Sequence, residues 1–280
     1  MTAAVRIGGA TRLYAIIGDP IAQVKSPGVY TMLFAERGID AVMLPAHVLP
    51  GRFDESVRGL MALGNLDGLV VTVPYKARMV PFATRLGPTA ARIAALNALR
   101  REPDGTWSGD MFDGAGFVQA ALRKGAVLAG RRVALFGAGG AGSAIACELV
   151  AVGVASLALI DPAPQRADTL ARLLAAAFPA CDIHVAAGVA GDRDMIVNAS
   201  TVGMHAGDGL PGDIGPLDAR TLVGDVVVTG TGPSALIRTA SERGCLTVDG
   251  HDMFAGQMDA LMGFFHPEAA SLAQAANAAD

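Results

Sequence analysis

The pattern that most clearly suggests chemistry is a glycine cluster in the middle of the chain. It follows a short apolar stretch at 133–136 and contains the spacing G-x-G-x-x-G in six consecutive residues: Gly137, Ala138, Gly139, Gly140, Ala141 and Gly142. Glycines let the backbone approach a pyrophosphate, and a helix that begins there offers unpaired N–H groups and the positive end of its dipole. A glycine-rich turn would explain a lone match, but a preceding strand and a following helix are what the dinucleotide fingerprint requires. The cluster therefore predicts that these six residues bind a dinucleotide.

Asp161 indicates which dinucleotide is bound. It ends the next expected strand, where an acidic side chain can accept hydrogen bonds from the adenosine ribose and repel a 2′-phosphate. Two alternatives stay open: Asp161 precedes Pro162 and could cap a helix instead, and Arg166 nearby would suit the 2′-phosphate of NADP. We predict that the cofactor is NAD, with NADP as the less favoured alternative.

Other catalytic classes lack the residue patterns that they need. The histidines show no spacing of metal ligands, and no G-x-S-x-G elbow is present for a covalent nucleophile, so we expect neither a metal site nor covalent catalysis. The cysteines are far apart and odd in number: Cys147, Cys181 and Cys245. This usage favours free thiols in a reducing compartment and predicts a cytoplasmic protein.

Composition excludes further classes of function. The 280 residues are 52% hydrophobic, enough to bury the core of one large or two modest domains. A net charge of -4, with no run of Lys or Arg, gives no electrostatic surface for nucleic acid. The mean hydropathy is +0.42, but Glu148 and several glycines interrupt the most apolar stretch at 133–160, so no membrane span is expected. The amino-terminal residues do not resemble a signal peptide.

The elements that must position the candidate residues alternate between strand and helix in the first part of the chain. Strands are expected where apolar runs end at glycine or proline: 13–17, 42–48 and 68–73. A first helix is expected to open with Ser26 as N-cap and to close at Gly38, and two more are expected at 52–63 and 75–86. A hairpin that turns on Pro-Asp-Gly is expected from the segments 94–101 and 106–110.

From residue 112 onward the pattern becomes strand, glycines, helix and strand. Helices are expected at 112–124 and 141–152, on either side of a strand at 132–136. Further strands are expected at short apolar runs: 157–160, 195–198, 223–228 and 246–248. They continue a parallel sheet, so a domain boundary is predicted inside the helix that starts near Phe112.

Five short strings occur in a fixed order over nearly the whole chain, with the glycine cluster between the fourth and the fifth. They are YAIIGDPIA at 14–22 with KSP at 25–27, VTVPYK at 71–76, ALN at 95–97, GDMFDG at 109–114 and GHDMFAGQ at 250–257. Together they resemble the shikimate/quinate dehydrogenase family. The resemblance implies an α/β protein of two domains with the active site between them, and a role in aromatic amino acid biosynthesis. One domain is an N-terminal α/β substrate domain with a mostly parallel sheet completed by C-terminal helices, at 1–112 plus 250–280, and the other is a Rossmann NAD-binding domain at 113–249.

The resemblance also implies a reaction and the residues that perform it. Oxidation of a secondary alcohol passes a hydride to the nicotinamide while the hydroxyl proton leaves, so a proton-exchanging group must touch the oxygen. Lys76 and Asp113 are the implied catalytic pair, although alone they would suggest a solvated helix lysine and a helix cap. Substrate binding is implied at six positions: Val24, Ser26, Thr72, Asn97, Thr229 and Gln257. Structural capping is the alternative for Asn97 and Gln257. Cofactor contacts beyond the glycine cluster are implied for Asn198, Ser200, Thr201, Val228 and Gly250.

Several positions that are polar in the family differ here, and most of them are apolar. The replacements are Val24 for a serine, Val70 for an asparagine, Ala98 for a threonine, Met111-Phe112 for an Asn-Thr pair, and Thr229 for a tyrosine. Each buried polar group of the substrate that loses its partner costs about 1–3 kcal/mol. We therefore predict that shikimate is a poor substrate and that the preferred cyclic alcohol or ketone is less polar. Weak shikimate or quinate activity with NAD is the alternative.

Two other classes of function stay open. A non-enzymatic sensor could bind NAD and signal through a partner, and turnover distinguishes it from an enzyme. Another two-domain dehydrogenase, of the folate or amino-acid type, would share the domain order but not the five strings. The expected ligand is a small cyclic molecule, with no nucleic acid and no membrane, and the sequence leaves monomer and homodimer open.

Overall fold

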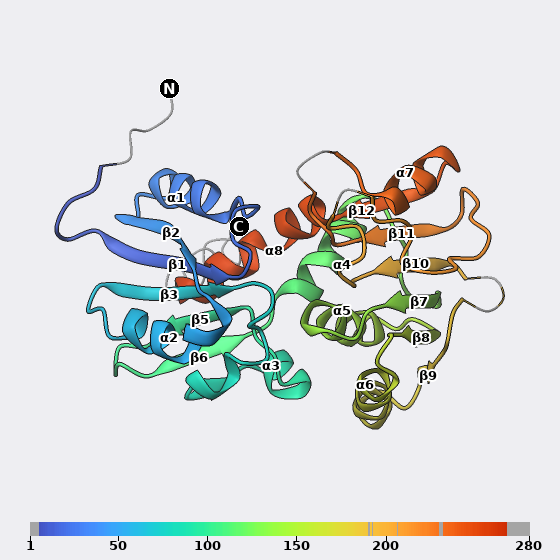
Figure 1. The fold of residues 1–280 in the computed structure, drawn as a ribbon, viewed down its shortest axis with the longest axis horizontal. Helices are drawn as coiled ribbons and strands as arrows, with labels where there is room; N and C mark the ends of the chain where they lie inside the picture. Colours follow the sequence, from blue (N-terminus) through green and yellow to red (C-terminus); the bar gives the residue numbers. More distant parts are fainter. Residues whose placement is uncertain (1–5, 190, 192, 206, 230–231, 268–280) are drawn as a thin grey trace, which may run out of the picture. The chain divides into compact units, whose positions relative to one another are not determined.

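The computed structural model describes residues 6–189, 191, 193–205, 207–229 and 232–267. These residues form two compact units (Figure 1). The first unit comprises the chain up to Met111 and again from Leu261, and the second is Phe112–Ala260. The first division falls beside the expected boundary after 112. The second lies inside the last helix, α8 (Gly250–Phe265), whereas we expected it between 249 and 250.

In the described part of the first unit, the strands form one sheet in the order β2-β1-β3-β5-β6-β4. β1 (Arg12–Gly18), β2 (Ala41–His47) and β3 (Leu66–Val71) are parallel, as predicted from the alternation of strands and helices. The predicted Pro-Asp-Gly hairpin is present as β5 (Ala98–Arg101) and β6 (Trp107–Asp110), and β4 (Arg85–Leu86) pairs with β6. The helices of this part are α1 (Ser26–Glu36), η1 (Pro50–Arg52), α2 (Phe53–Met61), η2 (Val80–Phe82) and α3 (Pro88–Ile93).

An aromatic cluster joins the last turn of α8 to the core of the first unit. Tyr14 on β1 is buried, and its ring centroid lies 4.8 Å from that of Phe34 and 5.0 Å from that of Phe265. Gly68 on β3 leaves room for these rings, because a Cβ there would lie 2.7 Å from Tyr14 and 2.8 Å from Phe265. The Tyr14 hydroxyl lies 3.3 Å from Nε2 of His266, and burial lowers the pKa of this imidazole. The end of the described chain therefore completes the first unit, as the resemblance implied.

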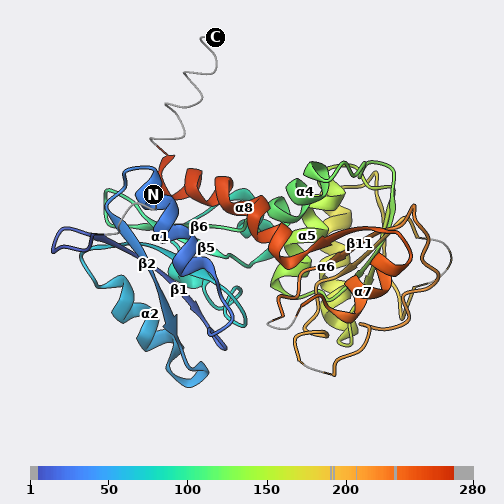
Figure 2. The same ribbon diagram turned by 90° about the horizontal axis from the view of Figure 1, so that it is seen from above.

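The residues described for the second unit contain an all-parallel sheet in the order β12-β11-β10-β7-β8-β9. Its strands are β7 (Arg132–Phe136), β8 (Ser156–Ile160), β9 (Asp182–Val185), β10 (Met195–Asn198), β11 (Leu222–Asp225) and β12 (Leu246–Asp249). The helices are α4 (Asp113–Arg123), α5 (Gly140–Ala151), α6 (Pro164–Ala177), α7 (Ala235–Glu242) and the first part of α8. α4 and α5 lie side by side (Figures 1 and 2). This is the predicted architecture of the second domain. The edge strand β9 was not predicted, because its sequence contains no apolar run.

Three predicted elements of the first unit are wrong. Residues 75–86 form turns, η2 and β4 in place of a helix, because Pro81 lacks the N–H that a helix through this segment would need to bond the carbonyl of Ala77. Residues 94–97 are not part of β5, since Ala94 takes a left-handed conformation with φ of 51°. Ser26 is the first residue of α1 and not its N-cap, which is Lys25.

In the second unit, β11 ends at Asp225, whereas we expected the strand to continue to 228. Within the part of the chain that the structure describes, no helix is long and apolar enough to span a bilayer.

Candidate active site

In the first unit, three predicted site residues lie at the carboxyl ends of the parallel strands. Thr72 follows β3 directly, and its N–H donates to β1 at 2.9 Å. Lys76 lies in the next turn, where its carbonyl accepts a hydrogen bond from Leu96 N at 3.0 Å. The carbonyl of the buried Asn97 accepts a hydrogen bond from Val71 N at 2.8 Å. Backbone pairing thus brings Thr72, Lys76 and Asn97 to one edge of the sheet.

A pair that the sequence did not single out lies at the same edge. His47 at the end of β2 places Nε2 2.7 Å from Oδ1 of Asp19, which follows β1. The N–H of Asp19 donates to Val73 O at 3.0 Å, and the hydroxyl of Tyr75 donates to Val48 O at 2.5 Å. Burial raises the pKa of Tyr75. The segment that carries Lys76 is therefore fastened to the ends of both β1 and β2. The sequence signal that could have identified His47 and Asp19 is that each lies at the end of a predicted strand.

Ser26 and Val24, predicted to face the substrate carboxylate, lie on the segment after β1. Ser26 is buried at the start of α1, and Val24 is half-buried in the preceding loop. Two other replaced positions, Val70 on β3 and Ala98 on β5, are paired directly across the antiparallel ladder. Both are buried, as is Met111. The apolar replacements therefore include a matched cross-strand pair, and no polar side chain faces an apolar one across this rung.

In the second unit, close helix packing places Gln257 against Gly116, one turn after Asp113. Asp113 is the first residue of α4 and is 3% exposed. A Cβ on Gly116, one turn later, would lie 2.7 Å from the Cβ of Gln257, and a Cβ on Gly256 would lie 2.1 Å from the carbonyl of Gly116. α8 therefore crosses α4 at backbone contact distance, with Gln257 against the turn that Asp113 opens. Gly114 permits a similar approach to α5, where a Cβ would lie 2.2 Å from Ala144 O.

The glycine cluster forms the predicted turn between β7 and α5. Gly137 has a φ of 93°, and a Cβ there would meet the backbone of Ala199 and Ser200 at 2.7–2.8 Å. A Cβ on Gly142 would lie 1.9 Å from Gly137 O, whereas a Cβ on Gly139 would meet nothing within 4 Å. Two glycines therefore permit tight packing, and the third leaves open space beside the helix amino terminus. This arrangement fits a dinucleotide pyrophosphate.

Asp161 follows β8 and turns back to the glycine cluster. Its Oδ2 accepts a hydrogen bond from Ala138 N at 2.7 Å, and its Oδ1 accepts one from Ala163 N at 2.8 Å. Nη1 of Arg166 lies 3.6 Å from Oδ2, and the Asp161 side chain is 1% exposed. Asp161 thus holds the loop between the glycine cluster and α6. It does not cap this helix, because the N-cap is Ala163 and no side chain caps it, so the capping alternative is wrong.

Asn198 belongs to a buried polar network that the sequence did not predict. Its Nδ2 donates to Asp225 Oδ1 at 3.0 Å and to Val202 O at 2.9 Å, and its Oδ1 accepts from Ser200 Oγ at 2.7 Å. Ser234, the N-cap of α7, donates to Asp225 Oδ2 at 2.6 Å. Burial raises the pKa of Asp225, and these hydrogen bonds oppose the shift. Asn198 therefore positions the loop that carries Ser200. A serine before a helical pattern was the one available signal for this network.

The remaining predicted cofactor residues lie in loops of the second unit. Thr201 is exposed. A Cβ on Gly250 would lie 2.7 Å from Cγ2 of Val228, so these two residues are neighbours. Thr229 is half-buried, and its hydroxyl donates to Gly232 O. Among the described residues, no group of three His, Cys, Asp or Glu side chains is placed to hold a metal ion.

Comparisons with known proteins identify the family of this chain. A family profile described as the shikimate dehydrogenase substrate binding domain matches residues 16–99. A shikimate dehydrogenase (NADP(+)) of Rubrobacter xylanophilus is 35% identical over 255 residues, which cover 90% of this chain and 89% of the relative. The chain belongs to the shikimate dehydrogenase family.

Solved structures show the same architecture. Shikimate dehydrogenase from Aquifex aeolicus superposes with a TM-score of 0.84 at 26% identity, over 94% of this chain and 95% of that one. Quinate dehydrogenase from Corynebacterium glutamicum in complex with NAD superposes with a TM-score of 0.78 at 26% identity, over 91% and 93%. The family and the two-domain α/β fold predicted from the five strings are confirmed. Membership places the chain among the oxidoreductases that act on CH–OH groups.

Proposed function

We propose that the protein is an NAD-dependent dehydrogenase that transfers a hydride between the nicotinamide and a secondary alcohol or ketone on a shikimate- or quinate-like ring. The ring is less polar than shikimate. One observation carries the proposal: backbone hydrogen bonds gather Thr72, Lys76 and Asn97 at one sheet edge, in a chain whose relatives are named shikimate dehydrogenases.

Lys76 and Asp113 handle the proton. A bound dinucleotide supplies the hydride acceptor. Loss of hydride from the alcohol carbon becomes favourable only as the hydroxyl proton departs, so the Lys76 amine accepts this proton in oxidation and returns it in reduction. Asp113, which is buried at the amino end of α4, is the second residue of this proposed catalytic pair. Asn97 and Gln257 hold ring hydroxyls through their amide groups.

The preference for NAD rests on Asp161. Its carboxylate is fastened to the glycine cluster through Ala138 N. An acidic residue at the end of this strand repels a 2′-phosphate. Arg166 offsets part of this charge, but its side chain is 59% exposed and its contribution is screened by water. The curated relatives are named for NADP(+), and the Corynebacterium quinate dehydrogenase was solved with NAD.

The lower polarity of the substrate rests on the replaced positions. Val70 and Ala98 are buried and opposite each other, and Met111 is buried as well. These side chains offer no hydrogen-bond partner to a ring hydroxyl. A substrate with fewer hydroxyl groups loses less on binding, because fewer of its polar groups are left unpaired.

The test is reduction of NAD and of NADP with shikimate, quinate and a panel of less polar cyclic hydroxy acids and alcohols. The matched variants are Lys76→Met and Arg78→Met. Arg78 lies on the same segment, where it stacks on Phe53 at 4.3 Å and is paired with Asp54 at 3.7 Å. Lys76→Met should lower kcat by about 100-fold or more, as expected for a lost general base. Arg78→Met should keep most of the activity, which separates loss of the amine from disturbance of the turn.

Turnover of a less polar alcohol that depends on Lys76 would establish both the reaction and the class of substrate. A higher kcat/KM for shikimate than for every other compound would overturn the substrate assignment but not the reaction. Binding of dinucleotide with no turnover of any compound would favour a sensor over an enzyme.

A further inference from the structure

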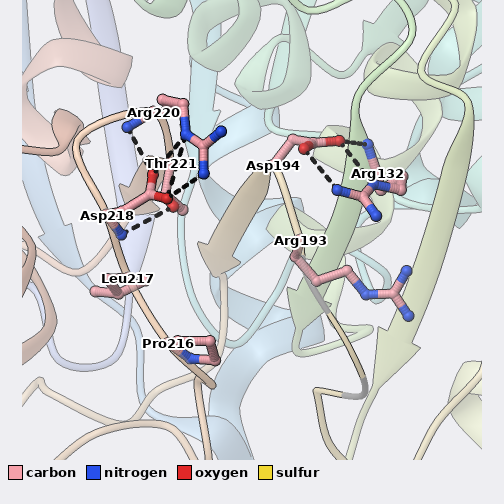
Figure 3. Close-up of a pocket in the computed structure, with 8 residues that line it drawn as sticks. All are labelled: Arg132, Arg193, Asp194, Pro216, Leu217, Asp218, Arg220 and Thr221. Atoms are coloured by element: carbon pink, nitrogen blue, oxygen red, sulfur yellow. Dashed lines mark hydrogen bonds and ion pairs between the residues drawn. The ribbon is translucent and has the colours of Figure 1, made fainter.

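A cavity of about 310 Å³ lies at the amino-terminal edge of the sheet in the second unit, the edge opposite to the glycine cluster. Its lining residues come from the starts of three adjacent strands, β7, β10 and β11, and from the segments that lead into them (Figure 3). They are Arg132, Arg193, Asp194, Pro216, Leu217, Asp218, Arg220 and Thr221. The volume is at the lower end of the range of small-molecule sites.

Two of the three arginines in the cavity are neutralised by carboxylates. Nη2 of Arg132 lies 2.9 Å from Oδ1 of Asp194 and its Nε lies 3.0 Å from Oδ2. Nη2 of Arg220 lies 2.7 Å from Oδ2 of Asp218. The hydrogen bonds from Arg132 lower the pKa of Asp194 to about 2, and those from Arg220 lower the pKa of Asp218. Both carboxylates are therefore ionised at neutral pH, and each cancels one guanidinium charge.

Arg193 is the third arginine, and its charge is not cancelled within the described residues. No ion pair joins it to a described carboxylate, and its buried Nε has no hydrogen-bond partner among them. Three arginines and two aspartates leave the lining with a net charge of +1. Figure 3 shows the Arg193 side chain extending to the same side as the guanidinium of Arg132. A buried donor without an acceptor is unfavourable, and an oxyanion would supply the acceptor.

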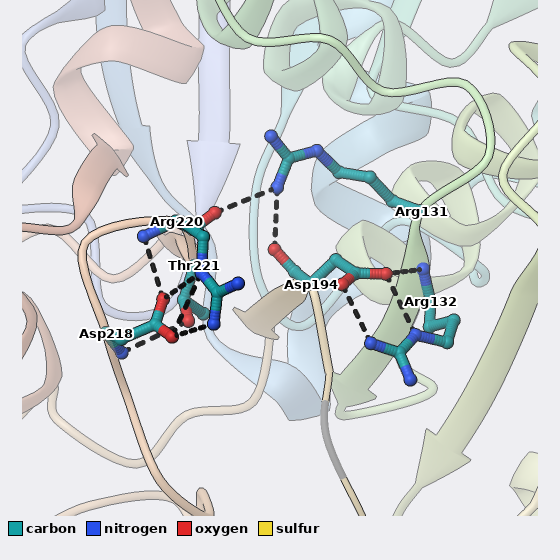
Figure 4. A network of polar contacts seen from close by, with 6 residues as sticks. All are labelled: Arg131, Arg132, Asp194, Asp218, Arg220 and Thr221. Atoms are coloured by element: carbon teal, nitrogen blue, oxygen red, sulfur yellow. Dashed lines mark hydrogen bonds and ion pairs between the residues drawn. The ribbon is translucent and has the colours of Figure 1, made fainter.

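The walls of the cavity are held in place by a residue just outside it. Nη1 of Arg131 donates to Asp194 O at 2.7 Å and to Arg220 O at 3.4 Å, so it bridges the two segments that carry the ion pairs (Figure 4). A site whose walls are fixed before binding loses less entropy when a ligand binds. Pro216 and Leu217 add an apolar surface to the charged lining.

We propose that this cavity is a binding site for a small phosphate-bearing anion, with Arg193 as its principal anchor and Pro216 and Leu217 in contact with the apolar part of the ligand. The site lies at the opposite end of β7 from the glycine cluster, since Arg132 begins this strand and Gly137 follows its end. It is separate from the proposed catalytic function and does not depend on it.

The test follows the Nε–Hε resonance of Arg193 in ¹H–¹⁵N spectra of the full chain, assigned by its loss in Arg193→Lys. Inorganic phosphate and phenyl phosphate are titrated at constant ionic strength. The Arg193 signal should shift and saturate with both probes, and phenyl phosphate should bind more tightly because its ring contacts the apolar wall. The Nε signal of Arg172, an exposed arginine on α6, should not shift in a saturable manner.

Calorimetry on two charge-matched variants completes the test. Arg193→Gln should weaken phenyl phosphate binding by about tenfold, whereas Arg172→Gln should leave it unchanged. Equal affinity in both variants would overturn the proposal, because the probe would then bind at another site such as the glycine cluster. Equal shifts of the Arg193 and Arg172 signals would overturn it as well, as they indicate a general effect of salt. Unchanged dinucleotide affinity in Arg193→Gln confirms that the variant is folded.

Discussion

The two edges of the sheet in the second unit both carry aspartates, but they stabilise these carboxylates with different groups. At the carboxyl edge the chain uses glycines, backbone N–H groups and the buried carboxylates Asp161 and Asp225. At the amino edge it uses arginines paired with aspartates, such as Arg132 with Asp194. The first edge is built from close backbone contacts and the second from long side chains. Changes at the carboxyl edge should therefore act through steric fit and desolvation, and changes at the amino edge through partly screened charge.

The largest effect is expected for Gly142→Ala at the carboxyl edge. The added Cβ would lie 1.9 Å from the carbonyl of Gly137, a backbone atom that cannot yield without moving the loop. We expect a loss of about 3 kcal/mol in the free energy of unfolding, typical of severe overpacking. Urea unfolding measures it. Gly139→Ala is the matched control: its Cβ meets nothing within 4 Å, so stability should be retained while dinucleotide binding weakens. Equal stability of the two variants would show that the backbone around Gly137 can move to accept the added Cβ, which would contradict the steric difference between the two edges.

Next in size is Arg131→Ala at the amino edge. The change removes the bonds from Nη1 to the carbonyls of Asp194 and Arg220. We expect the free energy of unfolding to fall by about 1–2 kcal/mol, toward the lower end for hydrogen bonds to charged groups, because the bond to Arg220 O is exposed and 3.4 Å long. Arg172→Ala on α6 provides the comparison and should change stability little. If both variants lose the same amount, the bridge between the two segments does not stabilise this edge.

Asp161→Asn tests the charge at the carboxyl edge without changing the shape of the side chain. The ratio of kcat/KM with NADP to that with NAD should rise by about tenfold, which corresponds to about 1.4 kcal/mol. Steady-state kinetics with both dinucleotides measure this ratio. Asp168→Asn, an exposed position on α6, is the control and should leave the ratio unchanged. No change in the ratio for Asp161→Asn would mean that Arg166 or another group sets the preference.

A smaller effect is expected for Asp225→Asn, and it should depend on pH. Burial raises the pKa of Asp225 in the folded protein above its ordinary value of 3.8. A raised folded pKa contributes stability that is present below the unfolded pKa and lost as the pH rises through the folded pKa. Relative to the variant, the wild-type protein should thus become less stable as the pH rises from about 4 to about 7. Urea unfolding across this interval measures the difference. A difference in the free energy of unfolding that stays constant with pH would contradict this prediction.

The smallest effect is expected for Asp194→Asn, with the opposite dependence on pH. Hydrogen bonds from Arg132 lower the pKa of Asp194 to about 2, so its contribution is present above 3.8 and is lost as the pH falls toward 2. The Asp194 side chain is 37% exposed, so solvent screens the pair and the contribution at neutral pH should stay below about 1 kcal/mol. Acid unfolding of the wild-type and variant proteins should converge as the pH is lowered. Curves that diverge on acidification would contradict the expected pH dependence of the Asp194 contribution to stability.

The accuracy of the sequence predictions followed the local strength of each signal. The strand at 132–136 was predicted with its observed bounds, and the Pro-Asp-Gly hairpin formed as expected, because apolar runs and turn residues act over a few positions. The helix predicted at 75–86 failed because Pro81 outweighed the apolar spacing. β9 was missed because its residues are exposed or only half-buried and form no apolar run.

The sequence by itself determined the family, the order of strands and helices around the glycine cluster, and the residue types available for chemistry at Lys76, Asp113 and Asp161. Only the tertiary structure decided which residues from distant parts of the sequence lie side by side. Thr72 and Asn97 share an edge because β3 pairs with β5, and Asp225 reaches Asn198 because β10 lies beside β11. The arginine-lined cavity likewise needs three strands in one order. Local patterns depend on backbone sterics and periodic burial, whereas contacts between distant residues depend on strand order, which local spacing does not encode.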